Sequence, residues 1–322
     1  MKTIRFGIIG LGSIAKKFAK VLSTADHVTL TAVAARDESR AIAFAEQFGA
    51  EKHYSSYVEL AKDIDVDAVY IALTHNFHYE VIKMCLLHGK NVLCEKPMVL
   101  HADEAIELAE LAEAKGLTLM EAMWTRCLPA YRKTCEWVME GRIGNVGLIQ
   151  ASFCFNVPVT NESRLFNPEL AGGALYDVGV YVVEFATGIL DESPVEIAAV
   201  SQKCETGVDS FTSLSLRFDS GAVASLTCGI TGSSSLDGHV IGDNGRILVH
   251  KFYMSEKCEL FDKDNQLIET FEEKTEDGFI YQIEHFADLV RHGELESPYI
   301  PLRDTIACAE LFDEVQMLCD LP

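Results

Sequence analysis

An acid and an amine follow directly after a short apolar segment in the sequence Leu93-Cys94-Glu95-Lys96-Pro97. The segment 91–94 is typical of a buried strand, which would bring Lys96 to the carboxyl edge of a sheet, where open α/β folds bind their ligands. A partly buried acid–lysine pair lowers the stability of a fold, so its presence suggests that it has a function. The pattern therefore predicts a reactive ammonium group at a ligand site, aimed by Glu95 and Pro97.

A second group of candidate residues occurs where Gly172 and Gly173 precede Asp177 and Tyr181. Asp177 and Tyr181 are four residues apart, so on a helix they share a face. The glycines allow the backbone to approach a ligand closely. The alternative is structural, since glycine-rich helix starts and buried tyrosines are common.

The sequence Gly-Leu-Gly-Ser-Ile-Ala at residues 10–15 lies between a predicted strand and a predicted helix and matches G-x-G-x-x-G/A. Gly10 permits a tight turn, Gly12 lets the backbone approach a pyrophosphate, and Ala15 allows close packing. The amides of Ser13 and Ile14 would then bind phosphate at the helix N-terminus. The pattern predicts dinucleotide binding, with a purely structural glycine turn as the alternative.

The end of the second predicted strand, Ala35-Arg36-Asp37, bears on the choice of dinucleotide. NAD-specific sites usually place Asp or Glu there to bind the ribose 2′-hydroxyl. Ala35 leaves space, and the Arg36 guanidinium is suited to a 2′-phosphate. Asp37, one residue later, complicates this interpretation, and Arg36 as a solvated loop cation is the alternative. We predict NADP as the cofactor, with NAD left open.

The segment after the third predicted strand would lie beside the nicotinamide ribose, with Thr74 and Asn76 as candidate hydrogen-bonding contacts and His78 as a structural or cofactor-lining group. His75 and His78 are spaced like two zinc ligands, but no third ligand follows at suitable spacing, so we predict no metal. Trp124 and Arg126 follow the fifth predicted strand. Trp124 would wall the cofactor cleft or pack between domains, and Arg126 would reach a cofactor phosphate or a nearby carboxylate.

The first third of the chain alternates strand and helix patterns, which predicts an α/β fold with a doubly wound parallel sheet, a Rossmann domain over residues 1–122. From about residue 125 the pattern changes to strands separated by tight-turn signals. We expect residues 123–322 to form an α+β domain with a large, mainly antiparallel open sheet, its C-terminal helix packing back on the first domain. An open sheet leaves a face to cover, which favours a homodimer through that sheet. The predicted strands of this domain are 146–155, 195–201, 211–218, 222–228, 239–242 and 246–250, and the predicted helices are 279–291 and 305–318.

Composition limits the possible partners and compartments. A formal charge of −22 over 322 residues makes nucleic acid an unsuitable partner. The ten cysteines are scattered and form no C-x-x-C pair, which is typical of buried small side chains in a reducing compartment. We expect neither a signal peptide nor an apolar stretch of the ~20 residues that span a membrane, and a cytoplasmic location.

Taken in order, Gly10-x-Gly12-x-x-Ala15, Glu95-Lys96-Pro97 and Gly172-Gly173…Asp177-x-Gly179-x-Tyr181 resemble the motifs of the Gfo/Idh/MocA oxidoreductases over essentially the whole chain. The segment from Glu121 to Pro129, together with Tyr181, resembles the branch of dimeric dihydrodiol dehydrogenases and NADP-dependent D-xylose dehydrogenases. Many sugar and inositol dehydrogenases of the family have histidine at the position of Tyr181. Met123 stands where this branch often has an aromatic residue.

The resemblance implies that Lys96 and Tyr181 flank a substrate hydroxyl while hydride passes between the substrate carbon and nicotinamide C4. Tyrosine and lysine have ordinary pKa values of about 10 and 10.4, and an adjacent ammonium favours a phenolate. We assign Tyr181 as the general acid/base and Lys96 as its partner and a substrate donor; the reverse assignment stays open. Asp177 would orient the substrate or hold Lys96. Glu95 would anchor the turn or contact the nicotinamide ribose.

Two further features follow from sequence and resemblance. The resemblance implies a cis peptide bond before Pro97. Phe153 and Phe155 share a face of a predicted strand, so Phe155 would line an apolar substrate pocket or else pack in the sheet.

The predicted function is hydride transfer between NADP and a sugar, polyol or trans-dihydrodiol. One alternative is an NAD-dependent sugar or inositol dehydrogenase. Another is a regulator that binds dinucleotide without turnover, which would have no need of Lys96 and Tyr181 together. A purely structural or interaction protein is disfavoured by the intact glycine motif.

Overall fold

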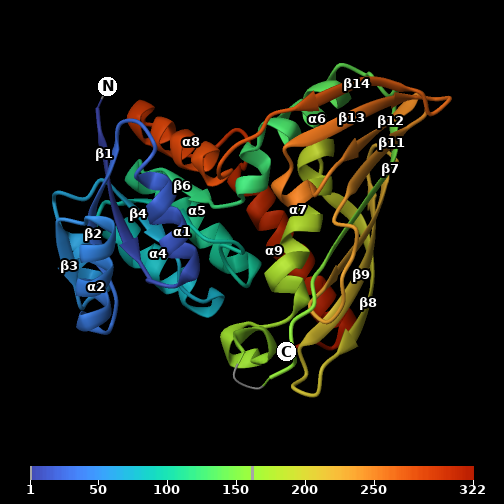
Figure 1. Cartoon of the computed structure of the whole chain (residues 1–322). Helices are drawn as coiled ribbons and strands as arrows, with labels where there is room; N and C mark the ends of the chain where they lie inside the picture. The colour runs from blue at the N-terminus through green and yellow to red at the C-terminus, as the bar shows by residue number, and fades with distance from the viewer. Residues whose placement is uncertain (1, 161–162) are drawn as a thin grey trace. The chain divides into compact units, whose positions relative to one another are not determined.

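The computed structural model describes residues 2–160 and 163–322, and it divides into two compact units (Figure 1). Unit 1 comprises the residues up to Trp124 together with Phe279–Ile306. Unit 2 comprises Thr125–Gly278 and Ala307–Pro322.

Unit 1 contains a six-stranded parallel sheet in the order β3-β2-β1-β4-β5-β6. The strand order reverses between β1 and β4, which is the topology of the predicted Rossmann fold. All side chains of β4 are buried, as expected for a central parallel strand covered on both faces. The strands are β1 (Ile4–Ile9), β2 (Val28–Ala34), β3 (Lys52–Tyr54), β4 (Ala68–Ile71), β5 (Asn91–Cys94) and β6 (Leu119–Glu121).

Two elements of unit 1 were not expected, β3 and the helix α3 (Tyr57–Lys62). Both are short, and β3 is an edge strand whose residues Lys-His-Tyr lack the apolar pattern of a buried strand. Helix α5 (Ala102–Lys115) begins after His101, which is its N-cap residue. The other helical elements are α1 (Ser13–Leu22), α2 (Glu38–Phe48), η1 (His75–Phe77) and α4 (His78–Leu87).

Helix α8 (Phe279–His292) belongs to unit 1, although it follows the whole of the second sheet in sequence. Phe286 is fully buried, and its ring centroid lies 5.9 Å from that of Phe6 on β1. The long helix α9 (Leu302–Cys319) begins in unit 1 and ends in unit 2. The units therefore differ from the predicted ranges 1–122 and 123–322, because apolar side chains after residue 278 complete the core of the first sheet.

Unit 2 contains an eight-stranded sheet in the order β14-β13-β12-β11-β7-β10-β9-β8. Only the β7–β10 pair among its described strand pairs is parallel, so the prediction of a large, mainly antiparallel sheet is confirmed. The strands are β7 (Val146–Cys154), β8 (Pro194–Lys203), β9 (Asp209–Phe218), β10 (Val223–Gly229), β11 (Gly238–Gly242), β12 (Gly245–Val249), β13 (Lys257–Asp262) and β14 (Leu267–Glu272).

One face of this sheet is covered by helices α6 (Pro129–Met139) and α7 (Val180–Leu190) (Figure 1). The alternation along β9 shows the two faces: Leu214 and Leu216 are buried, whereas Ser213 and Ser215 are exposed. The period of two therefore separates a helix-covered core face from an outer face of small polar side chains. The short helical segments are η2 (Trp124–Cys127), η3 (Arg164–Phe166), η4 (Pro168–Leu170), the π-helical turn η5 (Leu175–Gly179) and η6 (Phe252–Met254).

The helical region Pro168–Leu190 is long and apolar enough to cross a membrane by length and composition alone, contrary to the expectation that no such stretch exists. However, 89% of the most apolar 18-residue stretch in this region is buried inside the protein. The region therefore resembles a core helix of a folded domain, whose apolar side chains pack against the sheet.

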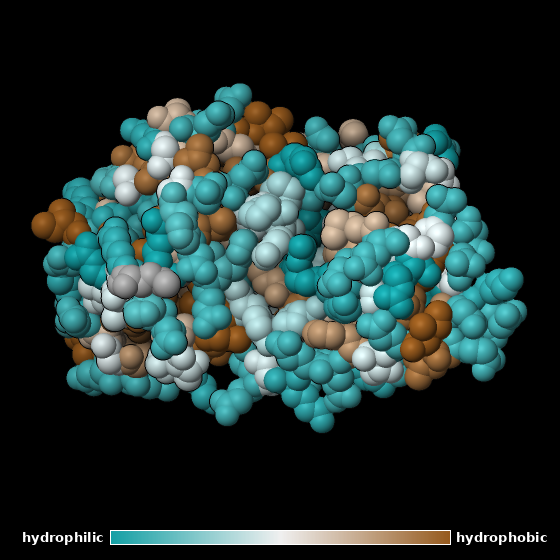
Figure 2. Space-filling view, turned by 90° about the horizontal axis from the view of Figure 1, so that it is seen from above, coloured by the Kyte–Doolittle hydropathy of each residue, from teal (hydrophilic) through white to brown (hydrophobic). Residues whose placement is uncertain are grey.

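Most of the cysteines are buried, as their scattered positions in the sequence predicted. All ten cysteines are free, and only Cys204 and Cys319 are not fully buried. Hydrophilic residues dominate the face of the molecule seen in Figure 2, and hydrophobic residues appear there as small separate groups.

Candidate active site

The glycine loop between β1 and α1 has the geometry of a phosphate-binding turn. Gly10 has a φ of +87°, and a Cβ there would lie 2.6 Å from the Ala72 carbonyl oxygen. Gly12 differs, because a Cβ on it would meet nothing within 4 Å. As a glycine at the N-cap of α1, it has no side chain that could bind the first amides of the helix. Of these two glycines, Gly10 is therefore required by packing within the protein, whereas Gly12 is not. The open space at Gly12, beside the amides of Ser13 and Ile14, fits the phosphates of a dinucleotide.

The end of β2 resolves the role of Asp37. Its carboxylate accepts hydrogen bonds from the Ser39 and Arg40 backbone amides at 2.9 and 3.3 Å and caps α2. The Ser39 hydroxyl hydrogen bond and the Arg40 amide hold the pKa of Asp37 below its ordinary value. Ala35 is buried, and the exposed Arg36 guanidinium lies 5.6 Å from the Phe77 ring centroid. Asp37 is therefore committed to the helix.

Arg40 is a cation that the sequence analysis did not single out. Its Nη2 atom lies 3.4 Å from the Leu11 carbonyl oxygen, which places this guanidinium beside the glycine loop. Arg36 and Arg40 thus lie on either side of Asp37, the N-cap of α2, and the place of Arg40 in the first turn of the predicted helix was the signal that could have identified this second cation.

Buried contacts fix the turn that carries Lys96 on its N-terminal side. Glu95 is buried, and its carboxylate accepts a hydrogen bond from the Tyr70 hydroxyl. The Tyr70 ring in turn stacks on Phe18, with 3.6 Å between centroids. Burial raises the pKa of Glu95, whereas the Tyr70 hydrogen bond and the Lys96 ammonium oppose this rise. Glu95 therefore anchors the turn, and Lys96 beside it is only half-buried.

The C-terminal side of the turn is held by His78 and Glu121. His78 is fully buried, with Nδ1 2.9 Å from the Pro97 carbonyl oxygen and Nε2 3.2 Å from that of Leu73. Glu121 Oε1 accepts a hydrogen bond from the Met98 amide at 2.9 Å. The peptide bond between Lys96 and Pro97 is cis, as the resemblance implied. His78 thus has a structural role at the ends of β4 and β5.

Thr74 and Asn76 lie between these elements and are half-buried. Thr74 Oγ1 donates a hydrogen bond to Asn76 Oδ1 at 2.8 Å, so the two side chains form one polar group after β4.

Within residues 2–160 and 163–322, no cluster of His, Cys, Asp and Glu is arranged to hold a metal ion.

Trp124 packs inside unit 1 beside a lysine that sequence reasoning missed. Its ring lies edge-on to Phe279 of α8, with 5.0 Å between centroids. Lys17 Nζ of α1 lies 4.7 Å from the Trp124 ring centroid and 3.9 Å from that of Phe279. The Lys17 charge also opposes the rise in the pKa of Glu95. Trp124 therefore lies in the same part of unit 1 as the start of α1 and the Lys96 turn.

Arg126 is buried in unit 2 and is paired with polar groups of α7. Its side chain is 1% exposed in unit 2, and its Nε lies 2.9 Å from Glu184 Oε2. Its Nη2 donates a hydrogen bond to the Thr187 hydroxyl at 2.9 Å. Of the two predicted partners, the structure contains the nearby carboxylate, while the cofactor phosphate contact stays a prediction. A buried charge takes the partner that compensates its lost hydration.

In unit 2, Asp177 lies in the π-helical turn η5, which continues into α7 at Val180 and Tyr181. π-Helical turns are frequent at functional sites. The Asp177 carboxylate accepts a hydrogen bond from Arg164 Nη2 at 2.7 Å. Arg164 is half-exposed and was not singled out in the sequence, because it lies in an irregular segment far from any motif.

Tyr181 is 9% exposed and lies in an aromatic cluster of unit 2. Its ring centroid lies 5.2 Å from that of Phe153 and 6.0 Å from that of Tyr253. Phe155 joins the cluster through Phe153, at 6.2 Å. Tyr253 was missed by sequence reasoning, and burial raises its pKa. The side chain of Phe155 is half-buried, so both alternatives for it, packing and substrate contact, stay open.

The predicted site residues thus form two groups. The glycine loop, the β2 end, Thr74, Asn76, the Lys96 turn and Trp124 lie in unit 1. Asp177, Tyr181 and Phe155 lie in unit 2. The pairing of Lys96 with Tyr181 stays a prediction, because it joins residues of different units.

Comparison with known proteins decides the family. Residues 4–123 match the model of the oxidoreductase family with an NAD-binding Rossmann fold, and residues 131–248 match the Gfo/Idh/MocA C-terminal domain. The chain belongs to the Gfo/Idh/MocA family of oxidoreductases. Unit 1 is accordingly its NAD(P)-binding domain, as the glycine motif predicted.

Individual relatives are dehydrogenases and reductases. Trans-1,2-dihydrobenzene-1,2-diol dehydrogenase from Mus musculus is 35% identical over 322 residues, which cover 97% of this chain and 96% of the mouse protein. The Homo sapiens protein of the same name is 34% identical, with the same coverage. The 3-ketoreductase KijD10 from Actinomadura kijaniata, solved with NADP and TDP-benzene, matches with a TM-score of 0.88 at 29% identity, covering 99% of this chain and 98% of that one. Levoglucosan dehydrogenase with NADH has a TM-score of 0.90 at 19% identity, which shows the fold alone.

The two loop glycines should fail in different ways. Gly12→Ala should fold with the stability of the parent and bind NADP more weakly, because its Cβ enters the space left for phosphate. Gly10→Ala should instead lower the melting temperature, because its Cβ meets the Ala72 carbonyl at a positive φ. Thermal unfolding without cofactor and a fluorescence titration with NADPH measure the two effects. Unchanged NADPH affinity in a stable Gly12→Ala would contradict the assignment.

Proposed function

We propose that the protein is an NADP-dependent dehydrogenase that acts on the CH–OH group of a sugar, a polyol or a trans-dihydrodiol. The observation that carries this proposal is the turn at Lys96, which Tyr70, His78 and Glu121 fix at the carboxyl edge of the nucleotide-binding sheet. Such rigid support is what a positioned catalytic group requires. The dihydrodiol dehydrogenases, at up to 35% identity over nearly the whole chain, support the substrate class.

The residues at the end of β2 favour NADP. The carboxylate of Asp37, the nearest candidate for a ribose 2′-hydroxyl, caps α2 instead. Arg36 and Arg40 present two cations at this position, and guanidinium groups bind phosphate strongly. Arg36 and Arg40 would hold the 2′-phosphate, and the open amides after Gly12 would hold the pyrophosphate.

Alcohol oxidation releases a hydride and a proton from the substrate, and the chain must supply the acceptor for the proton. The chemistry that a bound nicotinamide supplies is acceptance or donation of the hydride. Tyr181 would take the hydroxyl proton as general base and return it in the reductive direction. An aromatic surrounding disfavours a phenolate, so a nearby cation is needed, and the Lys96 ammonium would serve this purpose. Lys96 would also donate a hydrogen bond to the substrate oxygen.

Unit 2 offers surroundings suited to a cyclic polyol. Asp177 and Arg164 form a charged pair on the turn that leads to Tyr181, and such groups hydrogen-bond vicinal hydroxyls. The rings of Phe153, Phe155 and Tyr253 would pack against the apolar face of a ring-shaped substrate. The substrate contacts that we propose are Lys96, Phe155, Asp177 and Tyr181.

Two alternatives remain distinguishable. A regulator that binds dinucleotide without turnover would have no use for a fixed Lys96. An NAD-dependent sugar or inositol dehydrogenase would require an acceptor for the 2′-hydroxyl, a role from which Asp37 is withdrawn.

We also propose a homodimer through the outer face of the second sheet. The side chains of β8, β9 and β10 that face outward there are mostly small and uncharged, such as Val200, Ser213 and Thr227, and Val200 is 75% exposed. The charged residues Arg217 and Glu196 on this face form an ion pair with each other. Two copies of a chain with a charge of −22 repel one another, so a face of this kind is where they can meet. Light scattering at micromolar concentration should give the mass of a dimer, and a monomer would contradict this proposal.

Ten free cysteines support a reducing compartment such as the cytoplasm.

Tyr181→Phe should lower kcat by roughly 10²- to 10⁴-fold, the usual contribution of a general acid/base, while NADP affinity changes little. The matched control is Tyr253→Phe, the same substitution in the same aromatic cluster, which should retain most of the activity. Initial rates of NADP reduction with D-xylose and with trans-1,2-dihydrobenzene-1,2-diol measure both variants. An undiminished rate for Tyr181→Phe would remove Tyr181 from the mechanism.

NADP should bind at least about tenfold more tightly than NAD, which corresponds to one charge-assisted contact of about 1.4 kcal/mol. Arg36→Ala should remove most of this preference by weakening NADP alone. Asp37→Asn is the control, since asparagine also caps helices and the affinity for NAD should stay unchanged. Calorimetric titration of both cofactors checks these expectations. NAD preference in the parent, or loss of NAD binding in Asp37→Asn, would overturn the assignment.

A further inference from the structure

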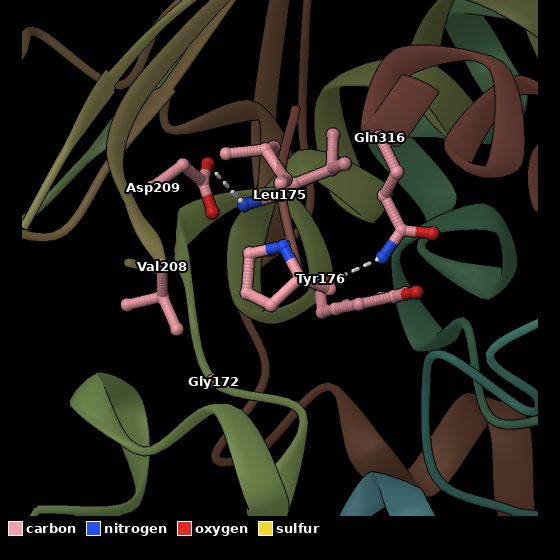
Figure 3. A pocket seen from close by; sticks show the side chains of 8 residues that line it. Gly172, Leu175, Tyr176, Val208, Asp209 and Gln316 are labelled. Atoms are coloured by element: carbon pink, nitrogen blue, oxygen red, sulfur yellow. Dashed lines mark hydrogen bonds between the residues drawn. The ribbon is translucent and has the colours of Figure 1, made fainter. Parts of the chain in front are cut away.

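The start of the helical segment that carries Asp177 and Tyr181 is held by a buried carboxylate from another element, Asp209 at the beginning of β9. Asp209 Oδ2 accepts a hydrogen bond from the Leu175 amide at 2.9 Å (Figure 3). Asp209 is 3% exposed, and no sequence motif drew attention to it. Its side chain lies 34 residues downstream of the amide that it binds, so it is a cap supplied from outside the helix.

The two motif glycines are explained by this arrangement. A Cβ at Gly173, which has a φ of +113°, would collide with Asp209 Oδ1. A Cβ at Gly172 would lie 2.6 Å from the Arg164 carbonyl oxygen and 2.7 Å from that of Leu165. Gly173 therefore makes room for the carboxylate, and Gly172 makes room for the segment that carries Arg164. The glycines serve packing within unit 2.

Asp209 is itself fixed from the sheet. Its Oδ2 accepts a hydrogen bond from the Thr212 hydroxyl at 2.6 Å, and Thr212 Oγ1 lies 2.7 Å from Ser201 Oγ on β8. Since Thr212 donates to the carboxylate, it accepts from Ser201. The result is a polar chain that runs from two strands of the sheet to the first turn of the helix.

The electrostatics agree with the geometry. Burial raises the pKa of Asp209, while hydrogen bonds from the Thr212 hydroxyl and from the Leu175 and Ala174 amides oppose that rise. The carboxylate thus replaces its lost hydration with the otherwise unsatisfied amides of a helix N-terminus, where negative charge is favoured. A neutral side chain of the same size would bind these amides less strongly.

We propose that Asp209 is a positioning residue for the reaction, which sets the axial position and rotation of the helical segment 174–190 and hence the placement of Asp177 and Tyr181. This inference rests on the proposed function, since it concerns the same site. Asp209 acts through the helix start, and its contacts with Leu175 and Thr212 are both made within unit 2.

The experiment compares Asp209→Asn with Asp219→Asn, the same substitution at an exposed aspartate just beyond the other end of β9. Asp209→Asn should lower kcat roughly 10- to 100-fold, because small displacements of reacting groups have effects of this size, and should shift the pH profile of kcat. NADPH affinity should stay at the parent value, since the glycine loop lies in unit 1. Asp219→Asn should match the parent in all three measurements. Parent-like kcat and pH profile in Asp209→Asn would overturn the proposal.

A second measurement does not depend on activity. Amide hydrogen exchange over residues 174–181 should be faster in Asp209→Asn than in Asp219→Asn, and equal exchange would overturn the proposal. If Asp209→Asn fails to fold, Thr212→Val removes one bond to the carboxylate and should give the same changes at smaller size; parent-like exchange and kcat in that variant would overturn the proposal. A parent that turns over none of the tested substrates would instead refute the proposed function, and the exchange result would then decide the role of Asp209 alone.

Discussion

Lys96 can act on a substrate only if the backbone on both sides of it stays fixed, and buried polar contacts provide this in addition to apolar packing. Tyr70 binds the Glu95 carboxylate, while His78 and Glu121 bind the backbone at Pro97 and Met98. Each of these partners comes from a different strand or helix of unit 1. Loss of any one contact would leave a buried polar group unsatisfied, so the turn has one favoured conformation.

The same principle operates in unit 2, with different residues. Asp177 and Tyr181 lie on a helical segment whose first amides bind Asp209, while Arg164 holds the Asp177 carboxylate. In both units the candidate catalytic side chains, Lys96 in unit 1 and Asp177 and Tyr181 in unit 2, extend from backbone that buried hydrogen bonds fix in place. The chemistry proposed for the protein, proton transfer coupled to hydride transfer, requires this precision of placement more than it requires unusual side chains.

Local signals in the sequence were sufficient for much of this structure. Alternating strand and helix patterns in the first third of the chain predicted the parallel sheet, and strands separated by tight-turn signals after residue 125 predicted the antiparallel one. The edge strand β3 and the capping role of Asp37 were missed, because neither depends on an apolar period. Arg164 and Asp209 were overlooked for another reason: their partners Asp177 and Leu175 lie 13 and 34 residues away. Only the fold brings such residues together.

The central claim is that Lys96 and Tyr181 act as one proton-transfer unit, and a double-mutant cycle on kcat/KM tests it most directly. The parent, Lys96→Met, Tyr181→Phe and the double variant would be compared with the same substrate and saturating NADP. If the two residues share one function, the double variant should be about as slow as the slower single variant. Two effects that multiply in the double variant would contradict the account and assign Lys96 and Tyr181 to independent roles.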